Sequence, residues 1–142
     1  MLKGIPSVLS PQLLKILMEM GHGDEIVIAD GNFPSASMAK NLVRLDGHGV
    51  NEILDALLQL MPLDTYVDEP VALMAVVKGD DVKPTIWEDY KSTINKYEPE
   101  NCKIQFMDRF DFYERAKNAY AVIATGETAI YANILLKKGV VK

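Results

Sequence analysis

One continuous apolar run, Pro70-Val-Ala-Leu-Met-Ala-Val-Val77, constrains the fold of this chain more than any other segment. A short run without polar alternation is typical of a β-strand that is covered on both faces. The segment Tyr120–Thr125 has the same character. Such strands interleaved with predicted helices make an α/β fold the prediction.

The segments between these runs alternate between helical and extended patterns. Apolar residues at helical spacing predict helices over 11–21, 50–61, 84–97 and 110–118, and Gly21 is the expected stop of the first helix. Short extended patterns predict further strands at 25–30, 43–46, 103–107 and 133–137. No repeat or long linker interrupts the 142 residues, which indicates one domain spanning residues 1–142.

Composition excludes several classes of function. The net charge is −5, and the 15 Lys and Arg are scattered among 20 acidic residues, so no basic stripe indicates nucleic-acid binding. No run of about 18 apolar residues predicts a membrane span, and the N-terminus does not resemble a signal peptide. The single Cys102 excludes an intrachain disulfide, and no metal-ligand spacing surrounds it or the two histidines. A cytoplasmic protein is expected.

The polar residues that could carry chemistry lie at the boundaries of the predicted elements. His22, Asp30, Arg109, Tyr131 and Asn133 all occupy such positions, where α/β proteins collect their sites. Each residue also has a structural interpretation: a helix end for His22, a turn for Asp30, an ion pair for Arg109 and packing for Tyr131. Taken singly, these residues do not decide between the two interpretations.

An ordered set of motifs along nearly the whole chain resembles the L-fucose mutarotase branch of the FucU/RbsD family. A short motif arises by chance, but this whole ordered set favours the functional interpretation of the boundary residues. The motifs are Glu19-Met-Gly-His-Gly-Asp-Glu25, Asp30 with Asn32-Phe33-Pro34, Arg44 with Asp46-Gly47, Leu63-Asp64-Thr65-Tyr66, Arg109-Phe-Asp-Phe-Tyr-Glu-Arg-Ala-Lys117, Ala124-Thr-Gly-Glu127 and Tyr131-Ala-Asn-Ile-Leu-Leu-Lys-Lys-Gly139.

The resemblance implies a single α/β domain around a mixed sheet flanked by helices, and an enzyme that interconverts the α and β anomers of L-fucose. It implies that His22 is the catalytic acid and that four residues bind the sugar: Asp30, Arg109, Tyr131 and Asn133. Tyr120, as a second proton-transfer group, and Asp64, contributed by a neighbouring protomer, are weaker candidates. Ring opening and closure need two proton transfers, so no cofactor or metal is expected.

The resemblance also implies a homo-oligomer with sites at subunit interfaces, and a decamer is one expected size. Two other functions stay open. A D-ribose pyranase of the same family is disfavoured by Arg109, because the ribose branch usually has histidine there. A monosaccharide-binding protein without catalysis is disfavoured by His22.

Two further expectations concern packing. Met18, Met20, Met61 and Met74 are expected to fill the core. Ala132 stands where glycine is common in the family, so its methyl group is a possible obstacle to a contact between backbone and sugar.

Overall fold

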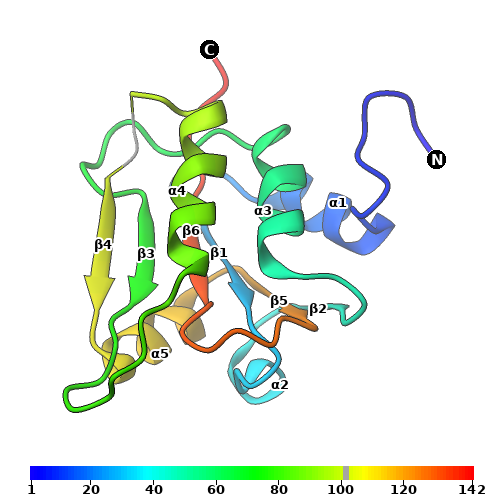
Figure 1. Ribbon diagram of the computed structural model, residues 1–142. Coiled ribbons are helices and arrows are strands. Elements are labelled where there is room, and N and C mark those ends of the chain that lie inside the picture. Colours follow the sequence, from blue (N-terminus) through cyan, green and yellow to red (C-terminus); the bar gives the residue numbers. More distant parts are fainter. Residues whose placement is uncertain (101–102) are drawn as a thin grey trace.

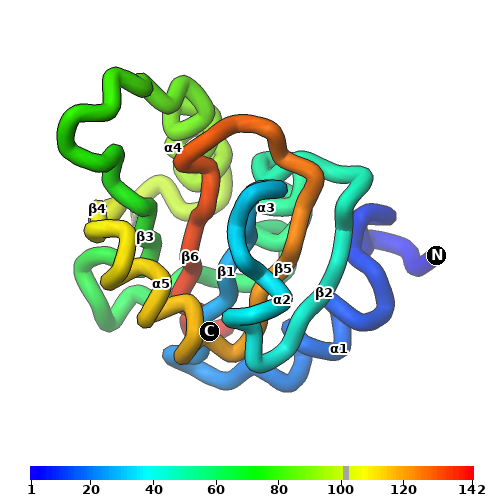
Figure 2. The backbone as a smooth tube through the Cα atoms, turned by 90° about the horizontal axis from the view of Figure 1, so that it is seen from below, coloured from blue at the N-terminus to red at the C-terminus, as the bar shows by residue number. Residues whose placement is uncertain are grey.

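A six-stranded mixed sheet forms the centre of the computed structural model, which describes residues 1–100 and 103–142 (Figure 1). Cys102 and the prediction attached to it lie outside these residues. The strands run in the order β2-β5-β1-β6-β3-β4, which Figure 2 shows from right to left. Their bounds are β1 (Glu25–Ala29), β2 (Leu42–Leu45), β3 (Val71–Met74), β4 (Ile104–Met107), β5 (Ala121–Thr125) and β6 (Ile134–Lys137).

Strand β6 runs antiparallel to both of its neighbours, β1 and β3, whereas the other neighbouring pairs are parallel. The carboxyl ends of β1 and β3 therefore lie next to the beginning of β6, at the same end of the central strands. The predicted α/β class and mixed sheet are confirmed.

Helices cover both faces of the sheet (Figure 1). On one face lie α1 (Pro11–Glu19), α3 (Val50–Leu58) and α4 (Ile86–Tyr97); on the other lie α2 (Ser35–Met38) and α5 (Arg109–Asn118). Within residues 1–100 and 103–142, none of the helices combines the length and apolar character that a membrane-spanning helix requires.

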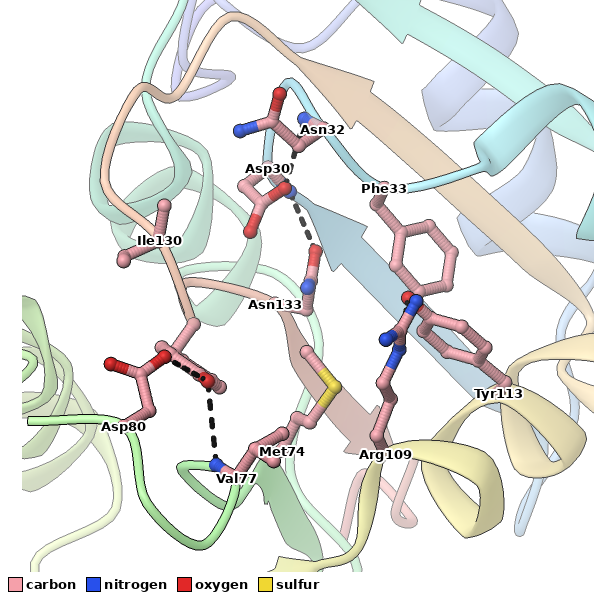
Figure 3. A pocket seen from close by; sticks show the side chains of 11 residues that line it. Asp30, Asn32, Phe33, Met74, Val77, Asp80, Arg109, Tyr113, Ile130 and Asn133 are labelled. Atoms are coloured by element: carbon pink, nitrogen blue, oxygen red, sulfur yellow. Dashed lines mark hydrogen bonds between the residues drawn. The ribbon is translucent and has the colours of Figure 1, made fainter. Parts of the chain in front are cut away.

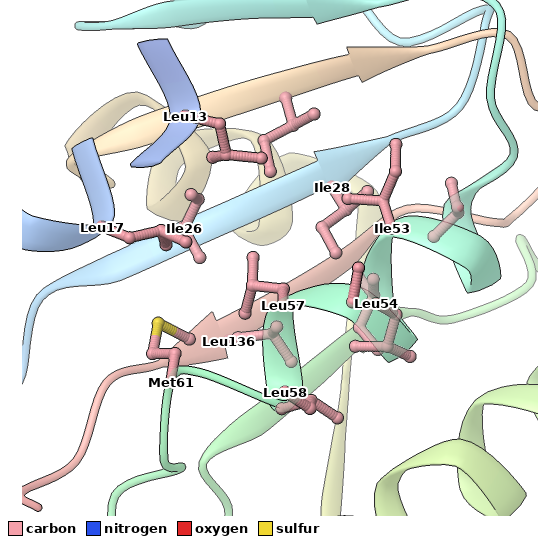
Figure 4. Packing of buried hydrophobic residues seen from close by; sticks show 14 of the residues in the cluster. Leu13, Leu17, Ile26, Ile28, Ile53, Leu54, Leu57, Leu58, Met61 and Leu136 are labelled. Atoms are coloured by element: carbon pink, nitrogen blue, oxygen red, sulfur yellow. The ribbon is translucent and has the colours of Figure 1, made fainter. Parts of the chain in front are cut away.

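Successive side chains of the central strand β1 point alternately into the two layers of the core. Ile26 and Ile28 pack with α1 and α3, as Figure 4 shows, while Val27 and Ala29 belong to the cluster under α2 and α5. All four side chains are fully buried. Strands that are covered on both faces in this way explain why the sequence shows continuous apolar runs instead of alternating patterns.

Several predicted boundaries differ from the structure; helix α3, for example, ends at Leu58 and not at Met61. Strand β3 ends at Met74 and not at Val77. Ala75 N–H still donates to the Met107 carbonyl oxygen at 2.8 Å, and beyond it the chain leaves the sheet. Helix α1 ends at Glu19 and not at Gly21. Lys138 Nζ donates to the Leu17 and Met20 carbonyl oxygens, so a lysine from the other end of the chain satisfies the helix terminus.

One further expectation fails for a local reason, and one element was not predicted. Met18 is 84% exposed, because it lies on the solvent side of α1, although it follows the apolar Leu17. Helix α2 has only four residues, Ser-Ala-Ser-Met, which is too short to display an apolar period. The predicted burial of Met20, Met61 and Met74 is confirmed.

The substitution Gly126→Ala tests the close approach of two loops at the end of the sheet where β1 and β5 finish. Gly126 N–H donates to the His48 carbonyl oxygen at 3.0 Å, and a methyl group at Gly126 would overlap the Asp46 carbonyl oxygen. We expect the free energy of unfolding, measured by urea denaturation, to fall by about 1–3 kcal/mol. The control is Gly47→Ala, where nothing lies within 4 Å of the added atom. Equal effects of the two substitutions would contradict the close approach.

Candidate active site

The β1–β6 pair brings together two polar side chains that are far apart in the sequence. Asp30 directly follows β1 and Asn133 directly precedes β6, and the antiparallel register pairs Ile28 with Ile134 beside them. Asp30 N–H donates to Asn133 Oδ1 at 2.8 Å (Figure 3). Among the described residues, the Asn133 amide nitrogen has no hydrogen-bond partner, so it is left as a donor at the pocket.

Asp30 and Asn133 line a pocket of about 270 Å³, near the lower end of the range for small-ligand sites. It lies beyond the carboxyl ends of β1 and β3, where open α/β sheets bind their ligands. Arg109 and Tyr131 also line it, so the structure brings together four of the residues that sequence analysis singled out.

The Asp30 carboxylate sits at the buried side of this pocket, with the residue only 5% exposed. Asn32 N–H donates to its Oδ1 at 3.0 Å, and Ala132 N–H donates to its Oδ2 at 3.4 Å. Burial raises the pKa of Asp30, the charge of nearby Glu127 adds to the rise, and the backbone N–H groups oppose it. A carboxyl group whose pKa is moved toward neutrality is suited to accepting and returning a proton.

The backbone before β6 is held in an uncommon conformation. Tyr131 has a φ of 57°, in the left-handed region that non-glycine residues seldom adopt. Trp87 Nε1 donates to the Tyr131 carbonyl oxygen at 2.8 Å, and the Tyr90 hydroxyl donates to that of Ala132 at 2.6 Å. These two bonds from α4 fix the segment that carries Tyr131 and Asn133.

The Ala132 side chain does not obstruct the pocket. The residue is fully buried and is not among those that line the pocket, and its N–H group points to Asp30. The N–H group and the carbonyl oxygen of Ala132 are therefore both bonded within the protein itself. The expected conflict between an alanine methyl and the pocket does not arise.

Arg109 borders the pocket from the first residue of α5. Its Nε donates to the Tyr113 hydroxyl at 3.2 Å, and its guanidinium lies 5.3 Å from the centre of the Tyr113 ring. The Tyr113 ring thus supports the guanidinium by a cation–π contact. Within residues 1–100 and 103–142 its terminal nitrogens have no hydrogen-bond partner, so they can donate to a ligand.

Sequence analysis missed the apolar wall of the pocket. Apolar residues at the ends of strands have the same sequence signal as core residues. Phe33 and Tyr113 fall within recognised motifs, but neither was assigned to the site. The wall is formed by Phe33, Met74, Val77, Tyr113 and Ile130 (Figure 3).

His22 lies at the opposite end of β1. Its Nε2 is 3.0 Å from Asp64 Oδ1, which also accepts a hydrogen bond from Tyr66 N–H at 3.0 Å. Because a carboxylate only accepts hydrogen bonds, Nε2 carries the proton in this pair and Nδ1 is the nitrogen available to a ligand. The side chain of His22 is 46% exposed, against 4% for Asp64.

Asp64 contacts His22 of its own chain, and its contribution to the site of a neighbouring protomer stays a prediction. Asp64 N–H donates to the Lys137 carbonyl oxygen at 3.0 Å, which holds it beside the end of β6 that pairs with the beginning of β1. Burial alone would raise the pKa of Asp64, but the Tyr66 N–H bond and the His22 contact outweigh it and lower the pKa. The carboxylate therefore stays ionised and orients the imidazole.

Tyr120 also lies at the end of the sheet away from the pocket. Its hydroxyl donates to Glu19 Oε2 at 3.0 Å, and it lines a groove with Gly23 and Asp24. The structure thus places it outside the group formed by Asp30 and Asn133. Its assignment as a second proton-transfer group stays a prediction.

His22 and the pocket at Asp30 are separated by the length of β1. Its five residues span about 16 Å at about 3.3 Å per residue. His22 and the pocket at Asp30 therefore cannot both contact one monosaccharide within a single chain. Within the described residues, no group of three or more His, Cys, Asp and Glu side chains could hold a metal ion.

Comparisons with known proteins agree along the whole chain. The pattern of the RbsD / FucU transport protein family matches residues 3–141. The human fucose mutarotase is 48% identical over 147 residues, covering 98% of this chain and 94% of that protein. The crystal structure of the fucose mutarotase in complex with L-fucose from Streptococcus pneumoniae is 57% identical, with a TM-score of 0.95, and covers 99% of this chain and 100% of that one.

A solved structure with ribose is more distant. Bacillus subtilis RbsD complexed with D-ribose is 28% identical, with a TM-score of 0.73, and the match covers 100% of both chains. The chain is thus similar to both proteins in fold but much more similar in sequence to the one bound to L-fucose.

The opposite environments of the two carboxyl groups predict separate titrations. We expect the Asp30 carboxyl to titrate above the ordinary aspartate pKa of about 3.9 and the Asp64 carboxyl to titrate below it. The measurement is a ¹³C NMR titration of the side-chain carboxyl carbons, assigned with Asp30→Asn and Asp64→Asn. Coincident midpoints, or midpoints in the reverse order, would contradict the two environments.

Proposed function

Because the chain belongs to the RbsD / FucU transport protein family and closely matches fucose mutarotases over almost its full length, we propose that it interconverts the α and β anomers of L-fucose. The observation that carries this proposal is the 57% identity, at a TM-score of 0.95, to a fucose mutarotase in complex with L-fucose. The pocket at Asp30 and Asn133 supplies a site of suitable size and polarity. Residues 1–142 act as one mutarotase domain.

The reaction opens the pyranose ring and closes it on the other face of the aldehyde. A general acid protonates the ring oxygen as its bond to the anomeric carbon breaks, while a base takes the proton of the anomeric hydroxyl. Closure reverses both transfers. The enzyme exchanges only protons with the sugar, so the chemistry requires neither hydride transfer nor a Lewis acid.

We assign the acid to His22 and the base to Asp30. Asp64 orients His22 through Nε2, so the proton passes through Nδ1. Imidazole suits this role because it can both donate and accept a proton. The raised pKa of Asp30 favours it as the group that takes and returns the hydroxyl proton. Arg109, Tyr131 and Asn133 hold the remaining hydroxyls.

Two protomers are needed to complete this site. His22 and Asp30 lie at opposite ends of β1, so His22 of one protomer has to reach the pocket of a neighbour. Exposed apolar side chains at both ends support such a contact. Val77 and Ile130 are each 47% exposed at the pocket, and Tyr66, whose ring centre is 5.2 Å from that of His22, is 70% exposed. The proposed active form is a cytoplasmic homo-oligomer, and a decamer is the size that the family resemblance implies.

A D-ribose pyranase is the alternative within the family. It opens the same hemiacetal but closes through another hydroxyl. The lower identity to the ribose-bound structure and the arginine at position 109 both favour fucose. A panel of fucose and ribose in the assay below separates these activities.

The substitution His22→Ala tests the acid. We expect anomer exchange on L-fucose, followed by NMR magnetisation transfer between the anomeric protons, to fall by about 10²–10⁴-fold. Fucose affinity, measured by calorimetry, should change by less than about tenfold, because one hydrogen bond is lost. The control is His48→Ala, which removes the other histidine and its exposed pair with Glu52. A fully active His22→Ala protein would end the assignment.

Mixing two inactive variants tests the shared site. One variant carries His22→Ala, which removes the acid, and the other carries Asp30→Asn, which removes the base, and the two are dissociated and reassembled together. If each site combines His22 of one protomer with the pocket of another, about a quarter of the sites in a random mixture have both groups intact. Activity should therefore return on mixing. A mixture that forms mixed oligomers, as shown by mass spectrometry, and stays inactive would exclude a shared site.

A further inference from the structure

The Tyr131 hydroxyl is already hydrogen-bonded on two sides where it borders the pocket. It donates to Asp80 Oδ2 at 2.7 Å and accepts from Val77 N–H at 3.3 Å; the dashed lines that end at the labelled Asp80 and Val77 in Figure 3 mark these two bonds. Both partners belong to the loop that follows β3. Tyr131 itself precedes β6, so these bonds join two loops at the carboxyl end of β3.

The Asp80 carboxylate is fixed from its other side as well. Val82 N–H donates to Asp80 Oδ1 at 3.1 Å. Gly79, with a φ of 92°, gives the loop a left-handed turn, and Asp80 N–H closes it on the Val77 carbonyl oxygen at 3.0 Å. The loop therefore points one carboxylate oxygen at the phenol and secures the other.

The number of hydrogen-bonding positions on a phenol decides what Tyr131 offers to a ligand. A hydroxyl has one proton to donate and two lone pairs that accept. Asp80 can only accept, so it takes the proton, and the Val77 N–H group can only donate, so it occupies one lone pair. What remains toward the pocket is one acceptor. Any sugar group that bonds this oxygen must supply a proton.

We propose that Asp80 is a positioning residue that holds the Tyr131 phenol as a hydrogen-bond acceptor for a hydroxyl of the sugar. This inference rests on the proposed function for the identity of the ligand. The phenol then accepts a hydrogen bond from the sugar, whereas the neighbouring Asn133 amide nitrogen and Arg109 guanidinium donate hydrogen bonds to it. With the Asp30 carboxylate as the second acceptor, the pocket offers both donors and acceptors to sugar hydroxyls.

The protonation of Tyr131 agrees with this role. Its hydrogen bond to Asp80 raises the pKa of the Tyr131 phenol, which Val77 N–H and Arg109 lower by less. The proton therefore stays on the phenol at neutral pH and remains directed at Asp80. Tyr131 orients the sugar in this arrangement, and the proton transfers belong to other groups.

The test compares Asp80→Ala, Asp80→Asn and Tyr131→Phe by fucose calorimetry and anomer-exchange kinetics. Loss of one oriented hydrogen bond predicts an affinity for L-fucose about threefold to tenfold weaker in Asp80→Ala and in Tyr131→Phe, with a smaller change in kcat. Asp80→Asn keeps an oxygen that can accept from the phenol, so it should recover most of the affinity. The matched control is Asp81→Ala, next to Asp80 in the same exposed loop.

Two further measurements separate positioning from a general structural role. Asp80→Ala introduced into Tyr131→Phe should cause no additional loss of affinity, because both changes remove the same contact. In Asp80→Asn, the ¹³Cζ resonance of Tyr131 should titrate at a lower pH than in the unaltered protein, because the negative charge beside the phenol is gone.

The proposal is overturned if the affinity losses add, if Asp80→Ala binds fucose normally, or if Asp80→Asn leaves the phenol titration unchanged. The phenol titration needs only Asp80→Asn, which keeps the shape of the side chain. It can therefore be measured even if Asp80→Ala fails to fold. An unaltered protein that binds L-fucose without anomer exchange would refute the proposed function but leave the Asp80 test intact.

Discussion

The antiparallel pairing of β6 with β1 is the interaction on which both functional regions depend. At one end its register pairs Ile28 with Ile134, so Asp30 and Asn133 meet directly beyond the last pair. At the other end it pairs Glu25 with Lys137, and the Lys137 carbonyl oxygen then receives Asp64 N–H. A shift by one residue would turn the β6 side chains to the opposite face of the sheet and separate both groups.

The pocket carries features that are unfavourable for stability and useful for binding. A buried carboxylate with a raised pKa, a tyrosine in the left-handed region and an amide nitrogen without a partner among the described residues lie side by side. Hydrogen bonds from α4 and the two buried clusters maintain this arrangement. Such local strain persists where the surrounding structure over-determines it, which is typical of functional sites.

The separation of His22 from the pocket gives the quaternary structure a chemical role. In one protomer Asp64 holds the imidazole with Nδ1 available, but no sugar in the pocket of that chain can reach it. Under the proposed function, assembly supplies the acid, so binding residues and acid belong to different chains. Exposed apolar groups at both ends of β1 are then surfaces that association would cover.

The sequence alone determined the α/β class, most of the elements and, through the ordered motifs, the residues Asp30, Arg109, Tyr131 and Asn133. These depend on local patterns, namely continuous apolar runs, helical spacing and polar residues at element boundaries. Only the tertiary structure decided how the residues are grouped. Asp30 meets Asn133 across 103 positions, His22 meets Asp64 across 42, and Tyr131 meets Asp80 across 51. The order of strands in the sheet and the register of β6 create these contacts, and neither leaves a periodic signal in the chain. The apolar wall could not be recognised for a related reason. Met74 ends a buried strand and Val77 continues its apolar run in the sequence, so neither differs from a core residue until the end of the sheet is known.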